Sequence, residues 1–130
     1  MTSLKKLKQQ AWSFYSQWRK ETTFCPALKT NVQVSLKGWN HLIGQSKFKK
    51  RSPGDLYRRL MLLPQAKDIT INSHTVQNIT RKNNKVFYVL EAVMPNMTKG
   101  CVGLSKVRVL YIKTKDEKFI FYSVMDRKID

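Results

Sequence analysis

The sequence predicts an α+β fold, with N-terminal helices packed on one face of a twisted, mainly antiparallel, four- to six-stranded sheet. Two observations lead to this prediction. Apolar residues recur at helical spacing in the first part of the chain, whereas most of the second half is rich in β-branched and aromatic residues interrupted by turn signals. With 130 residues, the chain (1–130) is expected to form one domain.

The first element is expected to be an amphipathic helix over residues 3–20, capped by Thr2 or Ser3. Apolar residues fall at alternating spacings of three and four, which is typical of one helix face. This stripe consists of Leu4, Leu7, Ala11, Phe14 and Trp18. Trp12 and Tyr15 lie off the stripe, so packing against the sheet is favoured over a helix on a membrane surface.

A strand is expected over residues 32–36, where apolar and polar residues alternate. Lys37 and Gly38 then turn the chain into a short helix over 39–43, on which His41 faces outward. The inward-facing residues of this helix are expected to be Trp39, Leu42 and Ile43.

A clearer helix start follows at Ser52, an N-cap serine with Pro53 at the first helical position and Asp55 three residues on. These signals predict a helix over 53–63 that ends at Pro64. Its buried face is expected to comprise Leu56, Leu60 and Leu63.

The remaining chain is expected to form strands, because its segments are rich in β-branched and aromatic residues. The predicted strands are 68–72, 75–81, 86–94, 104–113 and 118–124. Asn83 and Asn84 suit a two-residue hairpin turn, since asparagine tolerates positive φ, and Lys115 to Glu117 can form the last turn. Strict alternation along the last strand assigns Phe119, Phe121 and Ser123 to one face and Ile120, Tyr122 and Val124 to the other.

The chain is strongly basic: 25 Lys and Arg against 8 Asp and Glu give a net charge of +17. Such self-repulsion favours a polyanionic partner, and nucleic acid is the leading class, ahead of an anionic membrane surface or no polyanion at all. Charge is densest over residues 37–64, where aromatic side chains interrupt it. The basic residues there include Lys37, His41, Lys47, Lys49, Lys50, Arg51, Arg58 and Arg59, and the aromatic ones are Trp39, Phe48 and Tyr57.

Several site classes are not indicated. Cys25 and Cys101 are far apart and lack a Cys-x-x-Cys spacing or a histidine cluster, so no metal or other cofactor is expected. One disulfide between them stays open as an alternative if the protein is secreted. No apolar run approaches about 18 residues, so we expect a cytoplasmic protein without membrane insertion.

His41 is the best candidate acid or base, because histidine titrates near neutral pH and nearby cations favour its neutral form. The alternative that His41 is a surface histidine without a chemical role remains open. His74 lies in an expected turn, and Glu91 is either a base paired with a histidine or, more simply, the partner of a nearby lysine. Cations and one histidine suit cleavage of RNA by its own 2′-hydroxyl.

The order of these motifs resembles the barnase, EndoU, colicin tRNase and RelE-like (BECR) superfamily of metal-independent ribonucleases, particularly its small phage-associated and toxin members. The resemblance covers residues 32–125 and leaves 1–22, with the N-terminal helix, as an addition. Its motifs are Lys37-Gly38, Trp39-Asn40-His41-Leu42, Lys49-Lys50-Arg51, Leu62-Leu63-Pro64 and Phe121-Tyr122-Ser123-Val124.

The resemblance implies an endoribonuclease that leaves a 2′,3′-cyclic phosphate on tRNA, mRNA or rRNA, with an acidic inhibitor or antitoxin as a possible partner. Carried over, the catalytic residues are His41, Lys50 or Arg51, and Ser123, with Tyr122 as the neighbour that could replace Ser123. The expected substrate-binding residues are Lys37, Trp39, Arg58, Arg81, Arg108 and Tyr122.

Two other functions remain open. In a non-catalytic RNA- or DNA-binding module, the same cations hold the backbone while Trp39, Phe48 or Tyr57 stack on bases. In a structural role, the positive face docks an acidic protein.

Overall fold

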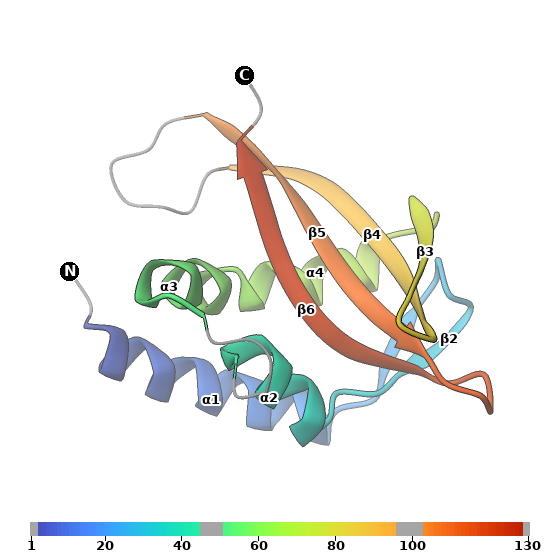
Figure 1. The fold of residues 1–130 in the computed structure, drawn as a ribbon, viewed down its shortest axis with the longest axis horizontal. Helices are drawn as coiled ribbons and strands as arrows, with labels where there is room; N and C mark the ends of the chain where they lie inside the picture. The colour runs from blue at the N-terminus through green and yellow to red at the C-terminus, as the bar shows by residue number, and fades with distance from the viewer. Residues whose placement is uncertain (1–2, 45–50, 96–102, 129–130) are drawn as a thin grey trace.

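A computed structural model describes residues 3–44, 51–95 and 103–128. The fold is α+β, as predicted, with helices on one side of a twisted antiparallel sheet of order β3-β4-β5-β6 (Figure 1). The helices are α1 (Leu4–Lys20), α2 (Leu36–Ile43), α3 (Pro53–Met61) and α4 (Leu63–Asn72). The main strands are β3 (Asn78–Lys82), β4 (Lys85–Pro95), β5 (Leu104–Lys113) and β6 (Phe119–Lys128), and β1 (Thr23–Cys25) pairs with β2 (Thr30–Val32) in a small separate sheet.

Helix α1 matches the predicted range, and Ser3 caps it by accepting a hydrogen bond from the Lys6 backbone N–H. The predicted stripe faces the core, but the placement of Tyr15 outside it is wrong. Tyr15 is fully buried, and its hydroxyl donates to the Ser35 carbonyl at 2.6 Å. The buried stripe is therefore wider than predicted, because Tyr15 continues the row of Leu7 and Ala11 at spacings of four.

The predicted strand over 32–36 is wrong. Strand β2 ends at Val32, and only Gln33 continues it, through a parallel bridge to Ile120 at the edge of β6. Ser35 then caps α2, because its hydroxyl accepts a hydrogen bond from the Gly38 N–H at 3.1 Å. A capping serine thus outweighs two-residue alternation, and the helix begins three residues before the predicted start.

The predicted stop at Pro64 and the predicted strand over 68–72 are also wrong. Pro64 lies in the first turn of α4, where its missing N–H removes no helical hydrogen bond. The β-branched residues that suggested a strand follow a helical period instead, with Ala66, Ile69 and Thr70 buried against the sheet. Tertiary burial therefore overrides strand propensity here.

The hairpin and the long strands confirm the sequence prediction. Asn83 and Asn84 have φ values of 51° and 64° between β3 and β4, and β4 and β5 match the predicted ranges within one residue. Strand β3 begins at Asn78, later than predicted, and β6 continues to Lys128.

A β-bulge in β6 corrects the predicted assignment of side chains to the two faces. Leu110 pairs with Ser123, but Tyr111 pairs with Phe121, so Tyr122 is an extra residue. Phe121 and Val124 both face the buried core, and Ser123 lies opposite Leu110 on the other face. The bulge is the local feature that brings Tyr122 and Ser123 to one side of the sheet.

Candidate functional site

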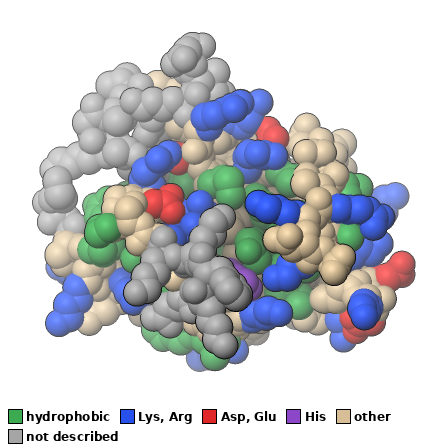
Figure 2. All heavy atoms as spheres, viewed as in Figure 1, with side chains coloured by type: hydrophobic (Ala, Val, Ile, Leu, Met, Phe, Trp, Pro, Cys, Tyr) green, Lys and Arg blue, Asp and Glu red, His purple; other side chains and the backbone are tan. Residues whose placement is uncertain are grey.

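A groove of about 600 Å³ lies on the sheet face opposite the helical core. Its sheet residues Phe87, Val89 and Leu110 alternate along β4 and β5 with buried core residues. Side chains from α2 and α3 reach it beside the edge strand β6. The cations that line it are Arg51, Arg59, Lys82, Lys85 and Arg108, and none of the described lining residues is acidic. Figure 2 shows basic side chains gathered around the middle of one face, with hydrophobic side chains between them.

His41, in the last turn of α2, lines the groove and has a shifted pKa. Its ring lies against Tyr122, with ring centroids 4.4 Å apart and planes inclined by 33°. Partial burial lowers the pKa of His41, and the charges of Lys85, Lys37 and Arg51 lower it further. The imidazole is therefore neutral at neutral pH and able to accept a proton.

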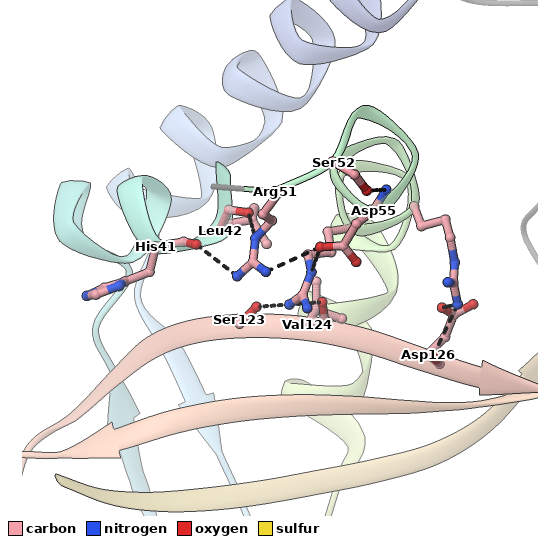
Figure 3. Close-up of polar contacts among 10 residues, drawn as sticks. His41, Leu42, Arg51, Ser52, Asp55, Ser123, Val124 and Asp126 are labelled. Atoms are coloured by element: carbon pink, nitrogen blue, oxygen red, sulfur yellow. Dashed lines mark hydrogen bonds and ion pairs between the residues drawn. The ribbon is translucent and has the colours of Figure 1, made fainter. Parts of the chain in front are cut away.

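Arg51, predicted to be catalytic, holds the end of α2 instead of presenting its N–H groups to the groove. Its Nε donates to the Leu42 carbonyl at 2.7 Å, and its Nη2 donates to the His41 carbonyl at 3.0 Å (Figure 3). Its Nη1 lies 3.3 Å from Asp55 Oδ2. Arg51 thus donates to two carbonyls in the last turn of α2, and the His41 carbonyl also accepts from the Gly44 N–H, so Arg51 fixes the turn that carries His41.

Asp55 also orients Arg59, which sequence reasoning did not select as a site residue. Arg59 Nε lies 3.0 Å from Asp55 Oδ2, and Arg59 Nη1 donates to Ser123 Oγ at 2.6 Å. Asp55 Oδ2 thus accepts from both arginines: Arg51, which contacts the end of α2, and Arg59, which contacts β6 (Figure 3). The signal in the sequence was the spacing, because Asp55 stands four residues from each arginine and shares one face of α3 with Arg59.

The predicted residues Ser123, Tyr122 and Arg108 all line the groove. Ser123 is only 1% exposed, and its oxygen accepts from Arg59. Tyr122 is more accessible and lies between His41 and Phe87, whose ring centroid is 5.0 Å away. Of the two hydroxyls, Tyr122 is better placed to contact a ligand beside His41.

Four other predicted binding residues do not line the groove. Trp39 is buried against Tyr15, with ring centroids 5.3 Å apart, so the structure does not present it to bases. Arg58 pairs with the Asp126 carboxylate, and Arg81 is exposed on β3, where its neighbours Thr80 and Lys82 line the groove. Lys37 is exposed in the first turn of α2, and its effect on His41 is electrostatic, because its charge lowers the pKa of His41.

The hairpin supplies groove residues that sequence reasoning missed. Lys82 and Lys85 flank the turn at Asn83 and Asn84, and Phe87 follows on the same face of β4. A basic residue on each side of a two-residue turn, followed by alternating aromatic and apolar residues, was the available signal.

The remaining candidates lie elsewhere. His74 is exposed, and it lines a separate hollow of about 280 Å³ at the end of α4 that Glu91 also lines. The Glu91 carboxylate pairs with Lys106 and Arg108, in agreement with the simpler interpretation of that carboxylate. Tyr57 packs partly buried against the core. The predicted residues Lys47, Phe48, Lys49, Lys50 and Cys101 lie outside the described residues, and Cys25 is buried.

Within the described ranges, no helix has the length and apolar character needed to cross a membrane. In the same part of the chain, no three His, Cys, Asp or Glu side chains gather as metal ligands. No protein-family model, curated protein or solved structure matches this chain. We therefore infer its function from the chemistry of the groove.

Proposed function

We propose that the protein is a metal-independent endoribonuclease of toxin or effector type that cleaves RNA in the groove. The observation that supports this most directly is a histidine with a lowered pKa beside a tyrosine, in a groove with five cations and no acidic residue among its described lining. A neutral imidazole beside an anion-binding surface is what transfer of a proton from a ribose hydroxyl requires.

The proposed reaction uses the 2′-hydroxyl of the substrate as its nucleophile. His41 removes the 2′-hydroxyl proton, the 2′-oxygen bonds to phosphorus, and the bond from phosphorus to the 5′-oxygen breaks. The Tyr122 hydroxyl supplies the proton to the leaving 5′-oxygen, and both side chains recover their protonation states by exchange with solvent. The products are a 2′,3′-cyclic phosphate and a 5′-hydroxyl, while the charges of Lys85 and Arg59 stabilise the phosphoryl oxygens.

A non-catalytic RNA- or DNA-binding module is the second candidate, and the arginine contacts favour it. Arg51 and Arg59 direct most of their N–H groups to Asp55, Ser123 and backbone carbonyls, so fewer donors point at a reacting phosphate. In this function the groove binds the backbone and Tyr122 or Phe87 stacks on a base. An acidic inhibitor protein would meet the same positive surface in either case.

Cleavage of a chimeric oligonucleotide tests the proposed reaction. In excess EDTA, a DNA strand with one internal ribonucleotide is expected to be cut only on the 3′ side of that ribonucleotide, leaving a 2′,3′-cyclic phosphate detectable by mass spectrometry. The same strand with a 2′-O-methyl ribonucleotide should stay intact, because its nucleophile is blocked. Uncut chimeric strand and uncut total RNA, at concentrations where a gel shift shows binding, would support the binding module instead.

The pH dependence of cleavage is expected to change when Lys85 is replaced by Gln. The Lys85 charge disfavours the protonated imidazole, so its removal raises the pKa of His41. Since the neutral form is the base, the acidic limb of the rate profile should move to higher pH. Lys37→Gln should move it the same way, and Lys5→Gln, on the exposed part of α1, should not. An acidic limb that stays in place in both Lys85→Gln and Lys37→Gln would show that it does not belong to His41.

A further inference from the structure

The open face of the sheet continues beyond the groove along β5. Arg108 lines the groove, and Lys106 lies two residues further along the same strand, on the same face. Arg108 pairs across the sheet with Glu91 of β4, and Lys106 pairs with Arg127 of β6. Three cations and one carboxylate thus occupy neighbouring register positions next to the groove.

Glu91 is shared between two of these cations with loose geometry. Its Oε1 lies 3.4 Å from Arg108 Nε, and its Oε2 lies 3.6 Å from Lys106 Nζ. Arg108 Nε is buried, yet it makes no hydrogen bond of good geometry among the described residues. The carboxylate therefore offsets charge without using the directional donors that a guanidinium offers to a phosphate.

Exposure shows which groups an incoming ligand would meet. The Glu91 side chain is 21% exposed, whereas those of Lys106 and Arg108 are 40% and 38% exposed. The side chains of the two cations are thus more exposed than that of the carboxylate between them, although Arg108 Nε itself is buried. A phosphate arriving from solvent can contact both cations, and the weak ion pairs of a partly exposed cluster cost little to exchange.

We propose that Lys106 and Arg108 form a second phosphate-binding subsite, which takes the RNA backbone where it leaves the groove and which Glu91 occupies in the absence of RNA. This subsite rests on the proposed binding of RNA in the groove. Lys106 lies four residues along β5 from Leu110, about 13 Å at the rise of an antiparallel strand. A dinucleotide carries one internucleotide phosphate and can fill only one of the two sites, so only longer RNA engages both.

Binding of 2′-O-methyl RNA, which cannot be cleaved, tests the subsite. Fluorescence anisotropy is measured with a dinucleotide and an octanucleotide over a series of salt concentrations. Lys106→Gln should weaken octanucleotide binding several-fold and lower the slope of log K against log salt by about 0.7, the value for one phosphate contact on a single strand. The affinity of the Lys106→Gln variant for the dinucleotide should equal that of the wild type.

The variant Glu91→Gln gives the complementary result. Loss of the competing carboxylate should tighten octanucleotide binding several-fold and leave dinucleotide binding unchanged. Lys113→Gln is the matched control, because Lys113 lies on the same strand with its Nζ over the Tyr88 ring on the other side of the sheet. It should affect neither ligand, and thermal melting checks that all three variants fold.

The outcomes separate this inference from the function on which it rests. If neither Lys106→Gln nor Glu91→Gln changes the affinity for the octanucleotide, the subsite is refuted. The proposed RNA binding and cleavage in the groove are unaffected by that result. Equal effects on the dinucleotide and the octanucleotide also overturn it, because they indicate a general change of charge. Failure of the wild-type protein to bind either RNA overturns the subsite and the proposed function together.

Discussion

Replacement of His41 by glutamine is expected to lower the rate of RNA cleavage by roughly 10²–10⁴-fold, the usual contribution of a general base. RNA affinity should change little, because the groove keeps its five cations and its aromatic side chains. The effect should therefore fall on kcat, with KM nearly unchanged, which is the pattern of an interaction made only in the transition state. Glutamine retains polar character beside Tyr122 but cannot take up the 2′-hydroxyl proton.

The chain provides a matched control in its other histidine. His74 is exposed outside the groove, so His74→Gln makes the same chemical change without touching the proposed site. Single-turnover cleavage and gel-shift affinity are measured for both variants. Cleavage by His41→Gln at the wild-type rate would contradict the role of His41 as base. A parallel loss of binding and cleavage would instead point to a part in RNA affinity.

The fold class could be predicted from local patterns, because helix caps and hairpin turns are local signals. Ser52 and Asn83-Asn84 act as their sequences indicate. The errors arose where two local patterns competed. Residues 68–72 are rich in β-branched residues, as a strand would be, but they belong to helix α4, whose Ile69 and Thr70 are buried against the sheet. This burial depends on residues distant in the sequence, so no local pattern indicates it.

The site was harder to predict, because its geometry depends on contacts between distant residues. His41 and Tyr122 were both named from the sequence, but only the bulge in β6 places Tyr122 beside His41. One extra residue in a strand changes which side chains share a face, and alternation alone does not reveal it.

The three arginines near α3 show the same limit. Arg51, Arg58 and Arg59 look equivalent in a basic segment, yet each has a different partner. Arg58 pairs with Asp126, which is 68 residues away, while Asp55 holds the other two. Net charge suggests an anion-binding surface, but the few carboxylates decide which cations remain available to it.

The largest effect on stability among the substitutions considered is expected for Gly38→Ala. Gly38 lies in α2 where the helix packs against β6, and an added Cβ would overlap the Phe121 carbonyl oxygen and lie 2.7 Å from the Tyr15 hydroxyl. Alanine gains about 1 kcal/mol over glycine as a helix former. The clash should outweigh this gain, because a strand carbonyl and a buried tyrosine cannot easily move, and overpacking typically costs about 1–3 kcal/mol.

Gly54→Ala supplies the comparison that isolates the clash. Gly54 is also helical, in α3, but a Cβ there meets nothing within 4 Å, so this variant should be as stable as the wild type or slightly more stable. Urea unfolding gives both free energies, and equal stability of the two variants would refute the close approach of α2 to β6. That approach also matters for function, because His41 lies one turn beyond Gly38 and faces Tyr122, which follows Phe121. A displaced α2 would separate the imidazole from Tyr122, so cleavage by folded Gly38→Ala should fall even under conditions where the variant is fully native.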